Sequence, residues 1–191
     1  MKHMQPFLAA HPDLEIDFTL SHDLLAPLLR DDLDLIIDCQ AHPLPTLKKV
    51  PLFRETYVVA CSKAFRKSHR VRMPADLAGC PVLSLDKAGT WWNRFLMAVP
   101  DQEQPQLDRI IAVTHIRAMI HAATEGMGVL LVPRYSVMGE LERGDLVALF
   151  PDIRPTEDRF SIYQKKVKAS HEKQRLLTRY LQSLSPAEFG S

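Results

Sequence analysis

The chain has 191 residues, of which 46% are hydrophobic, enough for a buried core in one domain or in two small lobes. Its 24 Lys and Arg side chains nearly balance its 23 Asp and Glu side chains, so it lacks the strongly positive charge of a nucleic-acid-binding domain. No apolar run reaches the ~18 residues of a membrane span and no secretory signal is recognised, so we expect a cytoplasmic protein.

Hydrophobic periodicity predicts alternating helices and strands in the first half of the chain. The expected elements are helix 5–11, strand 14–20, helix 22–31, strand 34–38, strand 51–61, a short turn helix and strand 82–85. Prolines such as Pro43 and Pro74 fall between these elements, where they interrupt neither a helix nor a strand.

The second half continues the alternation. The expected elements are helix 90–98, strand 109–113, helix 115–125, strand 129–132, helix 134–142, strands near 146–149 and 159–165, and helix 170–184. Strands that alternate with helices indicate an α/β architecture, and we expect mainly parallel sheets. The last helix carries an apolar stripe that predicts packing against a core, formed by Leu176, Leu177, Tyr180, Leu181 and Leu184.

The segment 113–133, VTHIRAMIHAATEGMGVLLVP, is the most informative part of the chain. Thr114 is placed to cap the following helix, which leaves neighbouring backbone N–H groups available for a ligand. Gly126 suits a position with positive φ after the helix, and Gly128 allows the next strand to leave without a side-chain clash. The pattern predicts a helix with a ligand-facing N-terminus, although any αβ unit of a doubly wound protein can have a similar pattern.

The three cysteines do not have the spacing of a metal or disulfide site. Their odd number fits a reducing compartment. Cys61 and Cys80 are expected to be buried and inert, whereas Cys39 follows a strand that should point toward a cleft.

Six motifs follow one another in a fixed order. They are HPDLEIDF at 11–18, LLAPLLRDDLDLII at 24–37, PLFRETYVVAC at 51–61, DLAGCPV at 76–82, the segment 113–133 and LERGDLV at 141–147. Each motif alone is weak, but together they resemble the effector-binding (substrate-binding) domain of LysR-type transcriptional regulators. The chain begins inside the family's first helix, so we expect a fragment without the family's first strand and winged helix-turn-helix.

The resemblance implies two Rossmann-like α/β lobes of the type II periplasmic-binding-protein kind, joined by two crossover strands. Lobe I would comprise residues 1–59 with 160–191, and lobe II residues 60–159. A small effector would bind between the lobes and change a hinge angle or a homodimer or tetramer, for which strand 14–20 and the N-terminal helix are the expected partner surface. DNA would be bound only by the N-terminal domain that this chain lacks.

Ligands of open α/β sheets bind at the carboxyl ends of the strands. In lobe I these ends place Ser21, His22 and Gln40 at the site, although Ser21 alternatively only caps the following helix, with Asp23 in its first turn.

In lobe II the strand ends are followed by six further candidates for contact with the effector. These are Ser84, Asp86, Lys87, Thr90, Trp91 and Thr114, with His115 beside Thr114. Thr90 is expected to cap helix 90–98, so that two helix N-termini favour an anion. A surface lysine, a core tryptophan and a structural histidine are the alternatives for Lys87, Trp91 and His115. By resemblance, the family holds small carboxylates, amino acids or aromatic acids at such positions.

No catalytic, cofactor or metal motif is present, so we expect neither an enzyme nor a metal or cofactor site. The alternatives are a solute-binding protein of the periplasmic class, an enzyme on the same fold, and a fragment that only oligomerises because its pocket is broken. A basic cluster at Lys63, Arg66, Lys67, Arg70 and Arg72 is interpreted as a solvated face in preference to a nucleic-acid site.

Overall fold

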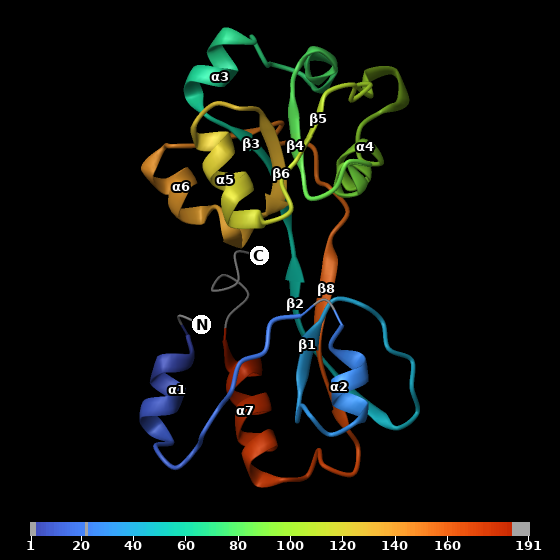
Figure 1. Ribbon diagram of the computed structural model, residues 1–191, viewed down its shortest axis with the longest axis vertical. Helices are drawn as coiled ribbons and strands as arrows, with labels where there is room; N and C mark the ends of the chain where they lie inside the picture. The colour runs from blue at the N-terminus through green and yellow to red at the C-terminus, as the bar shows by residue number, and fades with distance from the viewer. Residues whose placement is uncertain (1–2, 22, 185–191) are drawn as a thin grey trace. The chain divides into compact units, whose positions relative to one another are not determined.

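The computed structural model describes residues 3–21 and 23–184, which fold as two units (Figure 1). Unit 1 ends at Phe53 and resumes at Arg159, and unit 2 is Arg54–Asp158. The chain therefore passes between the units twice, once near the end of strand β2 and once at the start of strand β8. The lobe boundaries expected after residues 59 and 159 stay a prediction.

Unit 1 is a small sheet covered by helices on both faces. Its elements are α1 (Met4–Ala10), α2 (Leu25–Leu29), β1 (Ile36–Asp38), β2 (Leu47–Glu55), β8 (Asp158–Lys165) and α7 (Glu172–Ser183). The sheet order is β1–β8–β2, and β1 runs antiparallel to β8 with Ile37 opposite Ile162.

Successive side chains of these strands point to opposite faces, and this alternation produces two small cores. Ile162 packs with Phe7 of α1 and Leu181 of α7 on one face, whereas Tyr163 packs with Leu28 of α2 on the other. The apolar stripe of the last helix lies against the first of these cores, as predicted from its spacing.

The predicted strand 14–20 is wrong. The segment is extended but belongs to no sheet in the described part of the chain, and Leu20 is 97% exposed. Its alternation of apolar and polar residues satisfies the sequence criterion for a strand, but a strand also needs a hydrogen-bonded neighbour, which periodicity alone does not provide.

Unit 2 is a five-stranded sheet of order β5–β4–β6–β3–β7 with helices on both faces. Its strands are β3 (Tyr57–Cys61), β4 (Val82–Ser84), β5 (Ile110–Ala112), β6 (Val129–Pro133) and β7 (Val147–Leu149). Its helices are α3 (Lys63–Ser68), α4 (Asn93–Leu96), α5 (Ile116–Thr124) and α6 (Met138–Arg143), with 3-10 turns η1 (Pro74–Gly79), η2 (Thr90–Trp92), η3 (Asp101–Glu103) and η4 (Arg134–Ser136).

Strand β3, which lies between β6 and β7, is buried along its whole length. Val59 faces a core with Phe65 of α3 and Phe95 of α4, and Val58 faces a second core with Met119 of α5. Helices therefore cover both faces of the sheet, which explains the continuous apolar run of 129–132 in the neighbouring strand β6.

Several predicted elements are corrected by the structure. The sheet of unit 2 is mixed, because β4 runs parallel to β5 and β6, whereas β3 runs antiparallel to β6 and β7. The strand expected at 51–61 is interrupted at Thr56 and forms β2 and β3. The helices expected at 22–31, 90–98 and 134–142 are shorter, and the last two begin as 3-10 turns. Helix–strand alternation does not specify strand direction when strands connect two units.

The two glycines at the end of α5 have the roles predicted from the sequence. Gly126 has a φ of +79°, a conformation that favours glycine after a helix. A Cβ atom on Gly128 would lie 2.6 Å from the carbonyl oxygen of Pro81, so only glycine allows this approach. No helix in the described residues is long and apolar enough to cross a membrane.

Candidate functional site

In unit 2 the structure brings together the two groups of site residues predicted from its strand ends. β4 and β5 are parallel neighbours with Ser84 opposite Ala112, so both end at the same edge of the sheet. The N–H of Val113 donates to the carbonyl of Ser84 at 2.7 Å. The loop after β4 and the Thr114–His115 segment before α5 therefore start side by side.

The loop after β4 is closed by the carboxylate of Asp86. This side chain accepts a hydrogen bond from the N–H of Thr90 at 3.1 Å, and backbone N–H groups, that of Thr90 first, hold the pKa of Asp86 below its ordinary value. The hydroxyl of Ser84, itself buried, accepts a hydrogen bond from the N–H of Asp86 at 3.4 Å. Asp86 thus has a structural role in the loop, and Lys87 is exposed beside it.

The prediction that Thr90 caps a helix is wrong. Thr90 is the first residue of η2 and follows Gly89 in the left-handed conformation, while the carboxylate of Asp86 accepts the N–H that needs a partner. Asp86, four residues upstream, caps the turn in place of the Thr90 hydroxyl, because the loop folds back and brings its carboxylate to the N–H of Thr90.

The two adjacent tryptophans differ in burial. Trp92 is 1% exposed and donates its Nε1–H to the carbonyl of Leu83 at 3.0 Å. Trp91 is half-buried and meets Tyr57 edge-on, with ring centroids 5.7 Å apart. Trp91 therefore combines core packing with a partly open aromatic face.

The predicted cap of α5 by Thr114 is also wrong. His115 occupies the N-cap position, and no side chain makes a capping hydrogen bond. Thr114 and His115 are both exposed. The first-turn N–H groups of α5 are consequently not used by a cap within the described residues, and they carry the positive end of the helix dipole.

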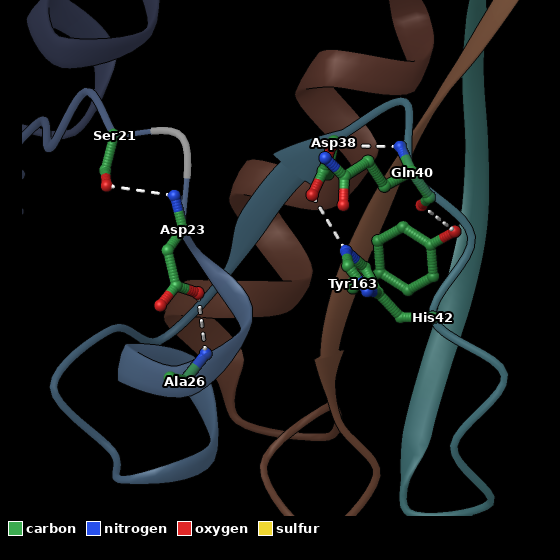
Figure 2. Close-up of polar contacts among 7 residues, drawn as sticks. All are labelled: Ser21, Asp23, Ala26, Asp38, Gln40, His42 and Tyr163. Carbon is green, nitrogen blue, oxygen red and sulfur yellow. Dashed lines mark hydrogen bonds and ion pairs between the residues drawn. The ribbon is translucent and has the colours of Figure 1, made fainter.

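In unit 1 the residues around Ser21 form a local turn (Figure 2). The Ser21 hydroxyl accepts the N–H of Asp23 at 3.1 Å, and the Asp23 carboxylate accepts the N–H of Ala26 at 3.4 Å. Because α2 begins only at Leu25, the predicted N-cap role of Ser21 is wrong, and its hydroxyl bonds within the preceding turn. His22 lies outside the described residues.

Gln40 belongs to a polar cluster at the end of β1, which Figure 2 shows beside Tyr163. Its N–H donates to the carboxylate of Asp38 at 2.9 Å, and its carbonyl accepts from the Tyr163 hydroxyl at 3.0 Å. The same aspartate lies 2.8 Å from Nε2 of His42, and both side chains are largely buried. Asp38 and His42 were not predicted, although their i, i+4 spacing after a strand was a usable signal.

A second polar cluster, in unit 2, was also missed. The Tyr57 hydroxyl lies 2.6 Å from the carboxylate of Glu55 and 2.9 Å from that of Asp158, which pairs with Arg94 at 2.6 Å. Glu55 is 4% exposed, and burial raises its pKa. Arg94 and Asp158 are far from Glu55 and Tyr57 in sequence, so no local pattern could identify the whole cluster.

Neither a metal site nor a reactive thiol stands out in the part of the chain that the structure describes. No group of three or more His, Cys, Asp or Glu side chains is arranged to hold a metal ion among these residues. Cys61 and Cys80 are buried, as predicted, and burial raises the pKa of Cys61 to about 11. Cys39 is exposed.

Comparison with known proteins identifies the family. Residues 1–185 match the family model described as the LysR substrate binding domain. No curated protein matches the sequence of the chain.

Three solved structures illustrate the similarity of fold. The regulatory domain of CrgA, a LysR-type transcriptional regulator from Neisseria meningitidis, is 17% identical with a TM-score of 0.78, covering 95% of this chain and 91% of that one. The effector domain of AmpR from Pseudomonas aeruginosa is 18% identical with a TM-score of 0.78, covering 99% and 89%. Full-length LysG from Corynebacterium glutamicum with bound effector Arg is 20% identical with a TM-score of 0.66, covering 83% and 53%.

These matches confirm the α/β fold of two lobes joined by two crossing strands. Since the family model spans almost the whole sequence, the chain belongs to the substrate-binding domains of LysR-type transcriptional regulators, which are regulatory, effector-binding domains.

Proposed function

We propose that this chain senses a small carboxylate-bearing effector, which binds in unit 2 at the edge where β4 and β5 end. The observation that carries the proposal is the family match over residues 1–185. The structural relative LysG holds the amino acid arginine as its effector, and arginine is therefore the first ligand to test.

The chemistry at this edge suits a carboxylate. The first turn of α5 presents N–H groups without a side-chain cap in the described residues, and such groups favour an anion. Lys87 is exposed on the neighbouring loop, and Trp91 offers an aromatic surface for an apolar part of the ligand. Gln40 and Ser21 of unit 1 are further candidates for contact.

Effector binding would act by favouring one conformation of the regulator through differential contacts. We propose that the change passes through a homo-oligomer to a separate DNA-binding domain, and that the protein works in the cytoplasm. The lobe boundaries at 59/60 and 159/160 belong to the same proposal.

A thermal-shift screen tests the proposal, with arginine, other amino acids and aromatic acids at millimolar concentration. A ligand at 100 times its Kd adds about 2.7 kcal/mol of stability, enough for a clear shift. Lys87→Gln and His115→Ala should reduce the shift. Thr124→Ala, at the opposite end of α5, is the control and should leave it unchanged.

Two outcomes would count against the proposal. The first is no shift with any of these compounds although the protein is folded. The second is a shift that Lys87→Gln, His115→Ala and Gln40→Ala all leave intact, since the ligand would then bind elsewhere. Conversion of the bound ligand into another compound would favour an enzyme on the same fold.

A further inference from the structure

Unit 2 has a hollow of about 480 Å³ on its surface at the C-terminal end of α3. Its lining consists of Val71, Val147 and five basic side chains, namely Lys63, Arg66, Lys67, Arg70 and Arg72. No carboxylate lines it. The basic cluster of the sequence is therefore gathered around a concavity, whereas the sequence predicted only a solvated face.

None of the five cations forms an ion pair with any residue that the structure describes. A second hollow in the same unit, of about 450 Å³ beside α5 and α6, is different. There Arg143 lies 2.8 Å from Asp145, and Arg117 lies 3.5 Å from Glu140. Of these two hollows, the one at α3 collects like charges that form no ion pair within the described residues.

Arg70 provides an independent observation. Arg70 lies two residues after the end of α3 and has a φ of +54°. The N–H groups of Arg70 and Val71 donate to the carbonyls of Lys67 and Arg66 in the last turn of the helix. This is the position at which helices favour glycine, because the left-handed conformation costs other residues roughly 1 kcal/mol. Helices α5 and α6 of the same unit do end with glycine, at Gly126 and Gly144.

A non-glycine residue keeps a positive φ where the surrounding structure holds it there, and a contact of its side chain can contribute to this. Asp31, with a φ of +69°, has one, because its carboxylate lies 2.8 Å from the ammonium groups of both Lys165 and Lys168. Among the described residues the Arg70 guanidinium has no ion-pair partner, and it lines the hollow with four other cations.

We infer that this hollow binds a small anion carrying several phosphate groups, such as a phosphorylated metabolite or a nucleotide. Arginine forks bind phosphate oxygens in pairs, and lysine ammonium groups add point charges. A volume of about 480 Å³ is within the range of small-molecule sites. The concave shape favours a compact anion over the extended backbone of DNA, which needs a longer basic stripe.

Calorimetric titration of the whole chain with inorganic tripolyphosphate, in low salt and without effector, tests this inference. We expect saturable binding with one site per chain. Arg70→Gly and Lys67→Gln should each weaken it about fivefold, the effect of losing one exposed charge contact. Arg179→Gln, an exposed cation on α7 of unit 1, is the matched control and should change the affinity less than twofold.

Arg70→Gly also separates binding from folding. Because glycine relieves the unfavourable φ, this variant should melt at the same temperature as the parent or higher, while it binds more weakly. If Arg70→Gly does not fold, the affinity of Lys67→Gln for tripolyphosphate tests the inference instead.

Three results would overturn the inference. One is no binding at millimolar tripolyphosphate. Another is a loss of affinity in Arg179→Gln as large as that in Arg70→Gly, which would show that tripolyphosphate is attracted by the overall positive charge and not by this hollow. The third is tight binding of duplex DNA that depends on Arg70 at a salt concentration where tripolyphosphate does not bind, since a nucleic acid would then be the ligand.

Discussion

Glu55 is a buried carboxylate of unit 2 whose pKa is raised by burial. Its neighbour Tyr57 has a single hydroxyl hydrogen, which lies between the carboxylates of Glu55 and Asp158. Arg94 makes its ion pair with Asp158, so Glu55 relies on hydroxyl donors while burial disfavours its charge. The charged form of Glu55 is therefore less favourable in the folded chain than in water.

Glu55→Gln should stabilise the protein at neutral pH. Because the folded-state pKa of Glu55 is raised, the stability that its protonated form contributes is complete below the unfolded pKa of about 4.3 and is lost as pH rises through the folded value. Glutamine keeps an acceptor for Tyr57 without a charge. We expect the Tm at pH 7 to rise by roughly 2–4 °C, with less variation between pH 4 and pH 7.

The melting curves of Glu157→Gln serve as the control, since Glu157 is exposed and 3.8 Å from Arg54. That change should have little effect at either pH. A lower Tm for Glu55→Gln at pH 7 would show that Glu55 stabilises the fold as a charged group. A pH profile identical to that of the parent would show that folding does not raise the pKa of Glu55.

Gly128→Ala should destabilise unit 2. The added methyl group would lie 2.6 Å from the carbonyl oxygen of Pro81, and backbone cannot move aside as a flexible side chain can. We expect a loss of about 2 kcal/mol or more in chemical denaturation. Gly79→Ala is the comparison, because nothing lies within 4 Å of its new methyl group, and it should be close to neutral. Equal losses of stability in Gly128→Ala and Gly79→Ala would contradict the close approach of Gly128 to the carbonyl oxygen of Pro81.

At the scale of the elements, Ser62 and Thr114 each precede a helix in the sequence, but only Ser62 makes a capping hydrogen bond within the described residues. The Ser62 hydroxyl accepts the N–H of Phe65 at 3.3 Å and caps α3, whereas Thr114 makes no capping bond to α5. Ser62→Ala should therefore cost about 1 kcal/mol in urea unfolding, and Thr114→Ala should cost only a few tenths. The reverse order would mean that Thr114 does cap α5.

Most elements were predictable from the sequence because their apolar periodicity is strong. Helix α5, strand β6 and the turn at Gly126–Gly128 lie where the pattern places them, since burial on both faces and the need for glycine are local signals. Segment 14–20 was not predictable in this way, because pairing with another strand decides whether an extended segment belongs to a sheet.

The candidate site was predictable only in part. Ligands of open α/β sheets bind at the carboxyl ends of the strands. The parallel neighbours β4 and β5 end at the same edge of the sheet, so Ser84 and Thr114 lie near each other. The capping roles of Ser21, Thr90 and Thr114 were wrong, because each cap depends on where the loop folds. The contacts of Tyr57 with Asp158 and of Arg94 with Asp158 span 101 and 64 positions, beyond any local pattern.

At the scale of the whole molecule, each unit has its own sheet and its own cores, and the chain passes twice between them. This architecture and the family match support a domain that changes state when it binds a small ligand. The near-neutral chain charge fits this role, with 24 basic and 23 acidic side chains. The cations at α3, which form no ion pair with the residues that the structure describes, are a local exception.

The most direct test of effector sensing is a two-dimensional ¹H–¹⁵N NMR titration of the labelled chain with arginine and the other amino acids and aromatic acids. We predict that an effector saturably shifts the amide signals of Ile116 and Arg117, in the first turn of α5, together with those of Asp86–Thr90. Saturable shifts that leave these amides unchanged, or no saturable shifts with any of the compounds, would contradict the proposed site.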